Sequence, residues 1–124
     1  MYTSFTIRYN FLDMKQFLAM FLGTPKKMQD WKPDQATMQK GMEAWMKWAI
    51  DHKGDIVNMG SPLGKTKKVS NAGIEDTHNE MGAWVVVQAA SQEEAAKMFE
   101  GHAHFTIFPG DRVEVMECLP MPKM

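Results

Sequence analysis

Three short segments along the chain have hydrophobic patterns that favour β-strands. In residues 15–22, every position from Phe17 to Leu22 is apolar, so both faces of an extended strand there are apolar. Residues 84–87 are also apolar and rich in valine, and the run extends to Ala89. Residues 112–118 alternate between polar and apolar positions. Strands that are apolar on both sides belong in a sheet that is covered on both faces.

Two segments carry the spacing of amphipathic helices. The first begins near Pro33 and Asp34, which are favourable first-turn and capping residues, and ends at Gly54. Its predicted apolar face contains Met38, Met42, Trp45, Met46, Ala49 and Ile50. The second begins at Ser91, which forms a capping-box pattern with Glu94, and ends at Gly101.

The remaining segments are short and more polar. Residues 55–60 and 65–70 predict two short strands, and turns follow each of them. Residues 26–33 and 74–83 predict polar connections, of which 74–81 could help to close a pocket. We expect a single domain over residues 1–124, with an arm or extra strand at 1–13 and a loose tail at 119–124.

The predicted order is strand, helix, strand with a small hairpin, strand, helix and strand. This βαββαβ order predicts an α+β fold, a ferredoxin-like sandwich with both helices on one face of an antiparallel sheet. No segment remains to cover the other face, although the strands at 15–22 and 84–89 are apolar on both sides. The sequence therefore predicts a homodimer packed sheet to sheet.

Composition limits the classes of partner and location. The net charge is −1, which argues against a nucleic-acid-binding protein. No apolar run is long enough to cross a membrane, and the single cysteine, Cys118, fits a cytoplasmic protein without disulfides. The 13 methionines favour flexible core filling, and the alternative is an adaptable apolar pocket or interface.

Several segments together resemble the YCII-related (DGPF-domain) proteins of the dimeric α+β-barrel group. They are residues 45–50, the turn at 60–63, the strand at 82–89, the motif at 90–95 and the closing residues 113–115. The resemblance implies a ferredoxin-like fold and a dimer whose two sheets enclose a pocket. Some members of that family are suspected enzymes with a His/Asp pair. Here Glu43 and the segment 101–104 stand near those positions, so the resemblance supplies no catalytic pair.

The motif His102-Ala-His104 is the main candidate for chemistry. On an extended segment the two rings would face the same side, roughly 6–7 Å apart, and one could act as an acid or base near neutral pH. The alternative is that both rings cap the C-terminus of the preceding helix or lie on the surface. His78, in the preceding polar loop, is a third candidate for proton transfer.

Metal and nucleotide sites are not expected. His78, Asp76 and Glu80 could supplement the His-x-His pair, but no spacing makes these residues converge. The segment from Gly60 to Thr66 has three residues between its glycines, one fewer than a phosphate-binding loop needs. We therefore expect no metal and no cofactor.

The candidate ligand-binding residues are Trp45, Trp48, Ser61 and Phe105. Aromatic residues such as these also fill cores and dimer interfaces. Two functions fit the pattern. One is a small enzyme that uses His102, His104 or His78 as acid or base on a small organic molecule. The other is a non-catalytic binding or accessory protein that uses the same dimer pocket.

Overall fold

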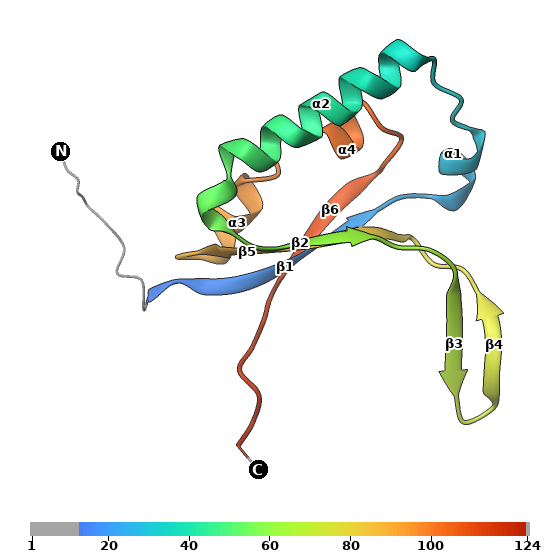
Figure 1. The fold of residues 1–124 in the computed structure, drawn as a ribbon. Helices are drawn as coiled ribbons and strands as arrows, with labels where there is room; N and C mark the ends of the chain where they lie inside the picture. The colour runs from blue at the N-terminus through green and yellow to red at the C-terminus, as the bar shows by residue number, and fades with distance from the viewer. Residues whose placement is uncertain (1–12, 124) are drawn as a thin grey trace.

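The computed structural model describes residues 13–123 and contains a four-stranded antiparallel sheet. The strand order is β2-β5-β1-β6, which is the order of a ferredoxin-like fold. The predicted fold class is therefore confirmed (Figure 1). The sheet strands are β1 (Lys15–Leu22), β2 (Ile56–Pro62), β5 (Met81–Ala89) and β6 (Arg112–Glu117).

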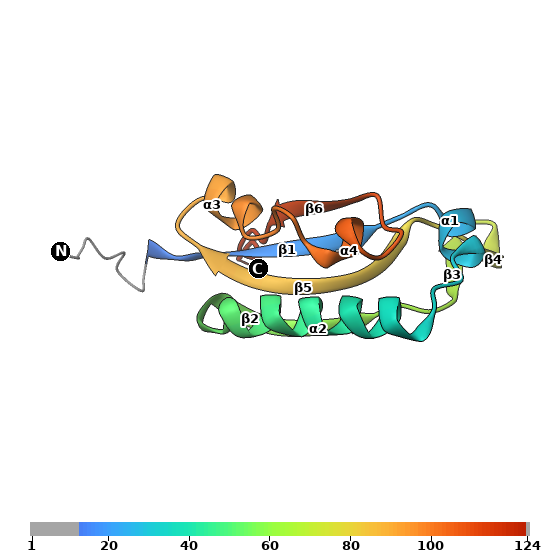
Figure 2. The same ribbon diagram turned by 90° about the horizontal axis from the view of Figure 1, so that it is seen from above.

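The helices lie on one face of this sheet (Figures 1 and 2). The long helix α2 (Gln35–Asp51) is capped by Asp34, whose carboxylate accepts the backbone N–H of Thr37. The short helix α3 (Gln92–Lys97) is capped by Ser91, as its sequence predicts. The helix α4 (Ala103–Thr106) is a single turn that lies close to α2.

The core lies between the sheet and these helices. Phe17, Phe21 and Val87 are almost completely buried and come from the two central strands. Burial of each side chain of this size contributes about 1.5–3 kcal/mol to folding. The core residues contributed by the helices and the turns beside them include Trp48, Ala49, Ala95 and Phe99.

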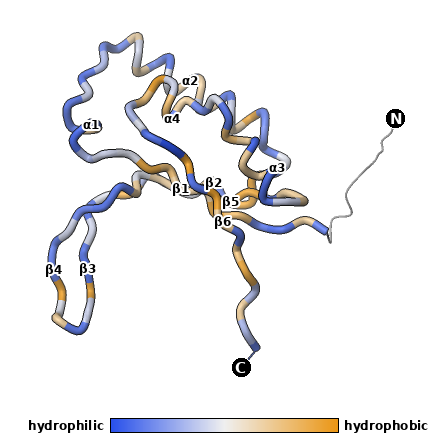
Figure 3. The backbone as a smooth tube through the Cα atoms, turned by 180° about the vertical axis from the view of Figure 1, so that it is seen from behind, coloured by the Kyte–Doolittle hydropathy of each residue, from blue (hydrophilic) through white to orange (hydrophobic). Residues whose placement is uncertain are grey.

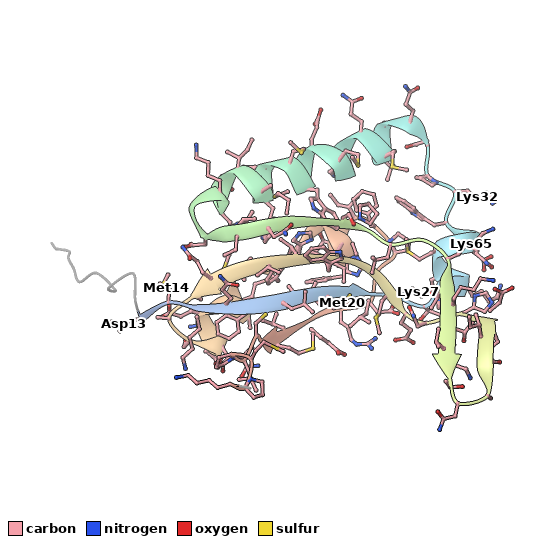
Figure 4. The ribbon with its side chains drawn as sticks, turned by 60° about the horizontal axis from the view of Figure 1, so that its bottom comes forward. Asp13, Met14, Met20, Lys27, Lys32 and Lys65 are labelled. Atoms are coloured by element: carbon pink, nitrogen blue, oxygen red, sulfur yellow. The ribbon has the colours of Figure 1, made fainter. Side chains whose placement is uncertain are left out.

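The opposite face of the sheet is apolar. Register pairs Leu18 with Val86 and Met20 with Trp84 across β1 and β5, and Met116 lies beside Leu18 on β6. Four of these side chains are partly buried and Met116 is 42% exposed. Figure 4 views the molecule from this side and labels Met20 on β1. No helix within residues 13–123 covers this face.

A second, two-stranded sheet projects from the main one. It contains β3 (Thr66–Ser70) and β4 (Gly73–Thr77). This hairpin and the C-terminal tail extend toward the side of the sheet opposite α2 (Figure 1), and hydrophobic residues cluster at the hairpin's end (Figure 3). The predicted tail has no regular structure over 118–123, whereas the predicted N-terminal arm falls largely on residues 1–12, outside the described part.

Four local predictions are wrong, and one of them is the end of the second helix, which lies at Lys97 and not at Gly101. The segment 74–83 is not a loop, because β4 pairs with β3 through the register Lys68–Glu75 and its neighbours. The segment 26–33 contains the helix α1 (Pro25–Asp30), which starts on a proline as helices favour. The long helix ends at Asp51 and not at Gly54, because a 3₁₀ turn, Lys53–Asp55, follows it.

The predicted apolar face of α2 is also partly wrong. Met38, Met42, Met46 and Ile50 are 41–61% exposed, whereas Gly41, Trp48 and Ala49 are buried. The reason lies at Gly41, where an added Cβ would lie 2.6 Å from the Phe108 ring. The helix thus packs through its small residues and tryptophans, and these methionines stay largely exposed.

None of the helices formed by residues 13–123 has the length and apolar character needed to cross a membrane.

Candidate functional site

A cavity of about 430 Å³ opens between α2 and the strands β2 and β5. Its size lies in the range of pockets that hold small organic ligands. Among the residues that line it are three tryptophans and four methionines, and none is Asp, Glu, Lys or Arg. The lining residues are Phe21, Met28, Met42, Trp45, Met46, Trp48, Met59, Gly60, Ser61, Pro62, Gly82, Ala83, Trp84, Val85, His104 and Phe108.

An irregularity in β2 shapes one wall of this cavity. The pairing with β5 shifts between Asn58 and Ser61, at a position where Gly60 has φ +67°. The side chain of Asn58 accepts the backbone N–H of Gly60 and holds this conformation. A Cβ at Gly60 would lie 1.7 Å from the carbonyl oxygen of Trp84, so only glycine fits here.

His104 brings a titratable group to the cavity. Its side chain is only 7% exposed, and its Nε2 lies 2.8 Å from the carbonyl oxygen of Leu22. Because a carbonyl only accepts, Nε2 must carry a hydrogen. In the neutral ring the lone pair is then on Nδ1, and no residue within 13–123 donates a hydrogen bond to it. Gly110 lies against this ring, and a Cβ there would be 2.2 Å from its Nε2.

His102 has a different environment. It is 2% exposed, and its Nδ1 accepts the backbone N–H of His104 at 2.9 Å, which caps α4. Its Nε2 is buried without a hydrogen-bond partner among the described residues. Burial, reinforced by the nearby His104 and His52, lowers the pKa of His102 from 6.5 to about 4. His102 is therefore neutral at pH 7.

Aromatic rings surround His102. Its ring centroid lies 4.5 Å from Trp45, 4.9 Å from Trp48 and 5.0 Å from Phe21. These three aromatic residues also line the cavity, whereas His102 does not. His102 therefore contacts the main chain of His104 from behind the cavity wall.

The predicted geometry of the His-x-His motif is wrong. The two residues are not on an extended segment, because His102 precedes and caps the single-turn helix α4 and His104 lies within it. They do not cap the end of α3 either, since that helix ends at Lys97. The sequence alone did not reveal this turn, because four helical residues are too few to produce a periodic pattern.

The structure places some of the other candidate residues at the cavity and the rest outside it. Trp45, Trp48 and Ser61 line the cavity together with His104. The indole N–H of Trp48 is already bonded to the carbonyl oxygen of Met98 at 2.7 Å. His78 and Phe105 lie outside the cavity lining. Phe105 is 38% exposed and borders a shallower hollow beside α3 and β6.

The cavity also contains residues that the sequence does not single out as site candidates. Phe108 follows α4 and has no recognisable pattern around it. For the methionines the sequence favours core filling, with an adaptable apolar pocket or interface as the alternative, and the structure places Met42 and Met46 in the cavity lining. Within residues 13–123, no three His, Cys, Asp or Glu side chains gather in a way that could hold a metal ion.

Comparisons with known proteins add little to this geometry. No model of a known protein family matches the chain. No curated protein is significantly similar in sequence. Among solved structures, the chain is similar to 5-chloro-2-hydroxyhydroquinone dehydrochlorinase (TftG) from Burkholderia phenoliruptrix AC1100, solved in complex with 2,5-dihydroxybenzoquinone. The identity is 17%, the TM-score is 0.49, and the match covers 81% of this chain and 89% of that one. The fold and the candidate site rest on the chain's own geometry.

Proposed function

We propose that the cavity binds a small, uncharged, largely apolar organic molecule and that His104 exchanges a proton with it. The observation that carries this proposal is the hydrogen bond from Nε2 of His104 to the carbonyl oxygen of Leu22. It fixes the ring in the tautomer whose lone pair is on Nδ1, and this is the atom that we propose meets the ligand. An imidazole held in one tautomer, with a lone pair on its other nitrogen, can accept a proton from a bound molecule.

The lining indicates which ligands are suitable. It contains no ionic side chain, so a charged ligand would lose its hydration without gaining a partner. A neutral molecule with one acidic O–H, N–H or C–H group would meet apolar walls and one base. After proton transfer, the Nε2–H of the imidazolium stays bonded to Leu22, which stabilises the cation. General-base catalysis of this kind typically gives about 10²–10⁴-fold acceleration.

The proposal includes a homodimer of the kind formed by YCII-related proteins of the dimeric α+β-barrel group, located in the cytoplasm. Leu18, Met20, Trp84, Val86 and Met116 support it, because they form an apolar surface on the sheet face opposite the helices. A second copy packed sheet to sheet would remove this surface from water.

A non-catalytic binding protein is the second candidate function. It is favoured by the composition of the lining, in which His104 is the one acid–base side chain among the described residues. Many enzymes that transfer protons use a second acid or base to complete the reaction. A binding protein needs the cavity and has no such requirement.

Two probes distinguish these functions. N-phenyl-1-naphthylamine is a neutral fluorophore that brightens in apolar sites, and 4-nitrophenol changes colour when its hydroxyl ionises. The variant His104→Gln keeps an amide N–H for the carbonyl of Leu22 but has no basic nitrogen. We expect both proteins to bind the fluorophore, and only the wild type to increase the ionised fraction of bound 4-nitrophenol.

Each other outcome has a definite meaning. Binding of 4-nitrophenol without increased ionisation in the wild type would overturn the proton-transfer role and support the binding protein. Failure of the wild type to bind either probe would overturn the cavity as a ligand site.

A further inference from the structure

Four exposed methionines surround the same cavity. Met28 on α1 is 48% exposed, Met42 and Met46 on α2 are 54% and 56% exposed, and Met59 on β2 is 54% exposed. They come from three separate elements and all line the cavity. We call these four residues the methionine rim.

Contacts made by α1 and α2 fix the position of the methionine rim. Met42 and Met46 are one helical turn apart on α2. Gly41 makes the close contact with Phe108, and the two methionines stay exposed beside it. Met28 is held nearby because Asp111, which precedes β6, accepts hydrogen bonds from Thr24 and Lys27 and so anchors α1. The packing of α1 and α2 against the rest of the protein therefore holds these exposed thioethers at the cavity.

Thioethers suit a rim of this kind for two reasons. Methionine is unbranched and polarisable, so its side chain can close around apolar ligands of different shapes. It is also the apolar side chain that a mild oxidant converts into a polar one. A rim of leucines would offer the same apolar surface without this chemistry.

We propose that the methionine rim is a site of reversible oxidation that controls entry of apolar ligands into the cavity, an inference that rests on the proposed ligand-binding function. The oxidant is a hydroperoxide. The thioether sulfur attacks the terminal peroxide oxygen, the O–O bond breaks, an S=O bond forms, and water or an alcohol leaves. Sulfur loses two electrons and the peroxide gains them.

The sulfoxide changes the entrance in a defined direction. Its oxygen is a strong hydrogen-bond acceptor that prefers water, and no charged or amide side chain lines the cavity to receive it. Covering it with an apolar ligand removes the hydrogen bonds that this oxygen makes to water. Reduction by a thiol-dependent methionine sulfoxide reductase takes two electrons from a thiol pair, removes the oxygen as water and restores the thioether.

The chain offers a matched control. Met121 lies in the C-terminal tail and is 87% exposed, so it should oxidise as readily as the rim. It is not part of the cavity lining. Oxidation of Met121 should therefore leave ligand binding unchanged, which separates a rim effect from general oxidation of the protein.

The test measures binding of N-phenyl-1-naphthylamine before and after limited treatment of the full chain with hydrogen peroxide. Peptide mass spectrometry locates each sulfoxide, and thermal unfolding monitors the fold. We expect oxidation of the rim to weaken binding about tenfold or more, and the reductase with dithiothreitol to restore it. The variant carrying Met28→Leu, Met42→Leu, Met46→Leu and Met59→Leu should bind the probe equally well before and after peroxide, whereas Met121→Leu should behave as the wild type does.

The inference is overturned if oxidised wild type binds as before, if the rim variant loses binding to the same extent, or if binding is lost only together with the fold. In these cases unoxidised protein still binds the probe, so the proposed cavity function survives. If unoxidised wild type does not bind the probe, the cavity function and the rim both fail.

Discussion

The ring of His102 accepts the backbone N–H of His104, with 2.9 Å between Nδ1 and the amide nitrogen. The two histidines are two residues apart and have different environments. The ring of His102 is buried behind the cavity wall and neutral, and His104 lines the cavity. The capping bond fixes the start of α4 and with it the position of His104.

Burial of neutral His102 should make stability depend on pH. Its pKa is about 4 in the folded protein, below the 6.5 of the unfolded chain. Between these values the unfolded state binds more protons, so stability falls as pH decreases from about 6.5 to 4. The loss due to this residue should be about 2–3 kcal/mol, measured by urea denaturation across this range.

His102→Asn is the matched variant for that measurement, because an asparagine oxygen can still cap α4 but has no titrating ring. Protonation of carboxylates changes the unfolding free energy of both proteins alike over this range. The variant should therefore lose less stability than the wild type between pH 6.5 and 4. Parallel profiles for the two proteins would contradict the assignment of this pH dependence to His102.

Gly110→Ala should displace the candidate base. A Cβ at this position would lie 2.2 Å from Cε1 and Nε2 of His104, so the ring must move away from the carbonyl of Leu22. We expect the ionised fraction of bound 4-nitrophenol to decrease, together with a loss of stability of about 1–3 kcal/mol from overpacking. Gly64→Ala is the control, since no atom lies within 4 Å of its added Cβ. Equal behaviour of the two variants would show that the contact between Gly110 and His104 has no functional role.

The sheet could be predicted from sequence because its strands carry strong patterns. Residues 15–22 are apolar on both sides, and the structure places this strand at the centre between β5 and β6. The capping residues Asp34 and Ser91 were also recognisable, because a helix start needs a side-chain acceptor at one defined position. The hairpin strand β4 was missed because both its faces are largely polar or exposed.

The candidate site was only partly predictable. Trp45, Trp48, Ser61 and His104 were selected from sequence and line one cavity. The sequence allows the methionines an apolar pocket but does not select the individual residues of the rim, because apolar periodicity shows which residues share a helix face but not which face meets the sheet. The contact between Gly41 and Phe108 determines that rotation, and it joins residues far apart in the chain.

A charge on the uncovered sheet face should prevent the proposed dimer. Met20→Lys places an ammonium group among Leu18, Trp84 and Val86, where a second copy would have to bury it. We expect the wild type to elute as a dimer in size-exclusion chromatography with light scattering, and the variant as a folded monomer. Met121→Lys, in the tail, should remain dimeric. A monomeric wild type would contradict the proposed assembly.

Gly60→Ala should damage both the fold and the cavity, and Gly101→Ala shows how much of the effect is due to backbone strain alone. The two glycines have nearly the same φ, +67° and +69°, which costs a residue with a Cβ about 1–2 kcal/mol. An added Cβ at Gly101 has no atom within 4 Å, whereas at Gly60 it would lie 1.7 Å from the carbonyl oxygen of Trp84.

Gly101→Ala should therefore lose only the strain energy, measured by urea denaturation at pH 7, and should keep its affinity for N-phenyl-1-naphthylamine. Gly60→Ala must also separate β2 from β5 where they form the cavity wall, so it should lose more stability and bind the fluorophore more weakly. If the two variants lost equal stability and bound the probe equally well, the close approach of Gly60 to Trp84 could not be what shapes the cavity.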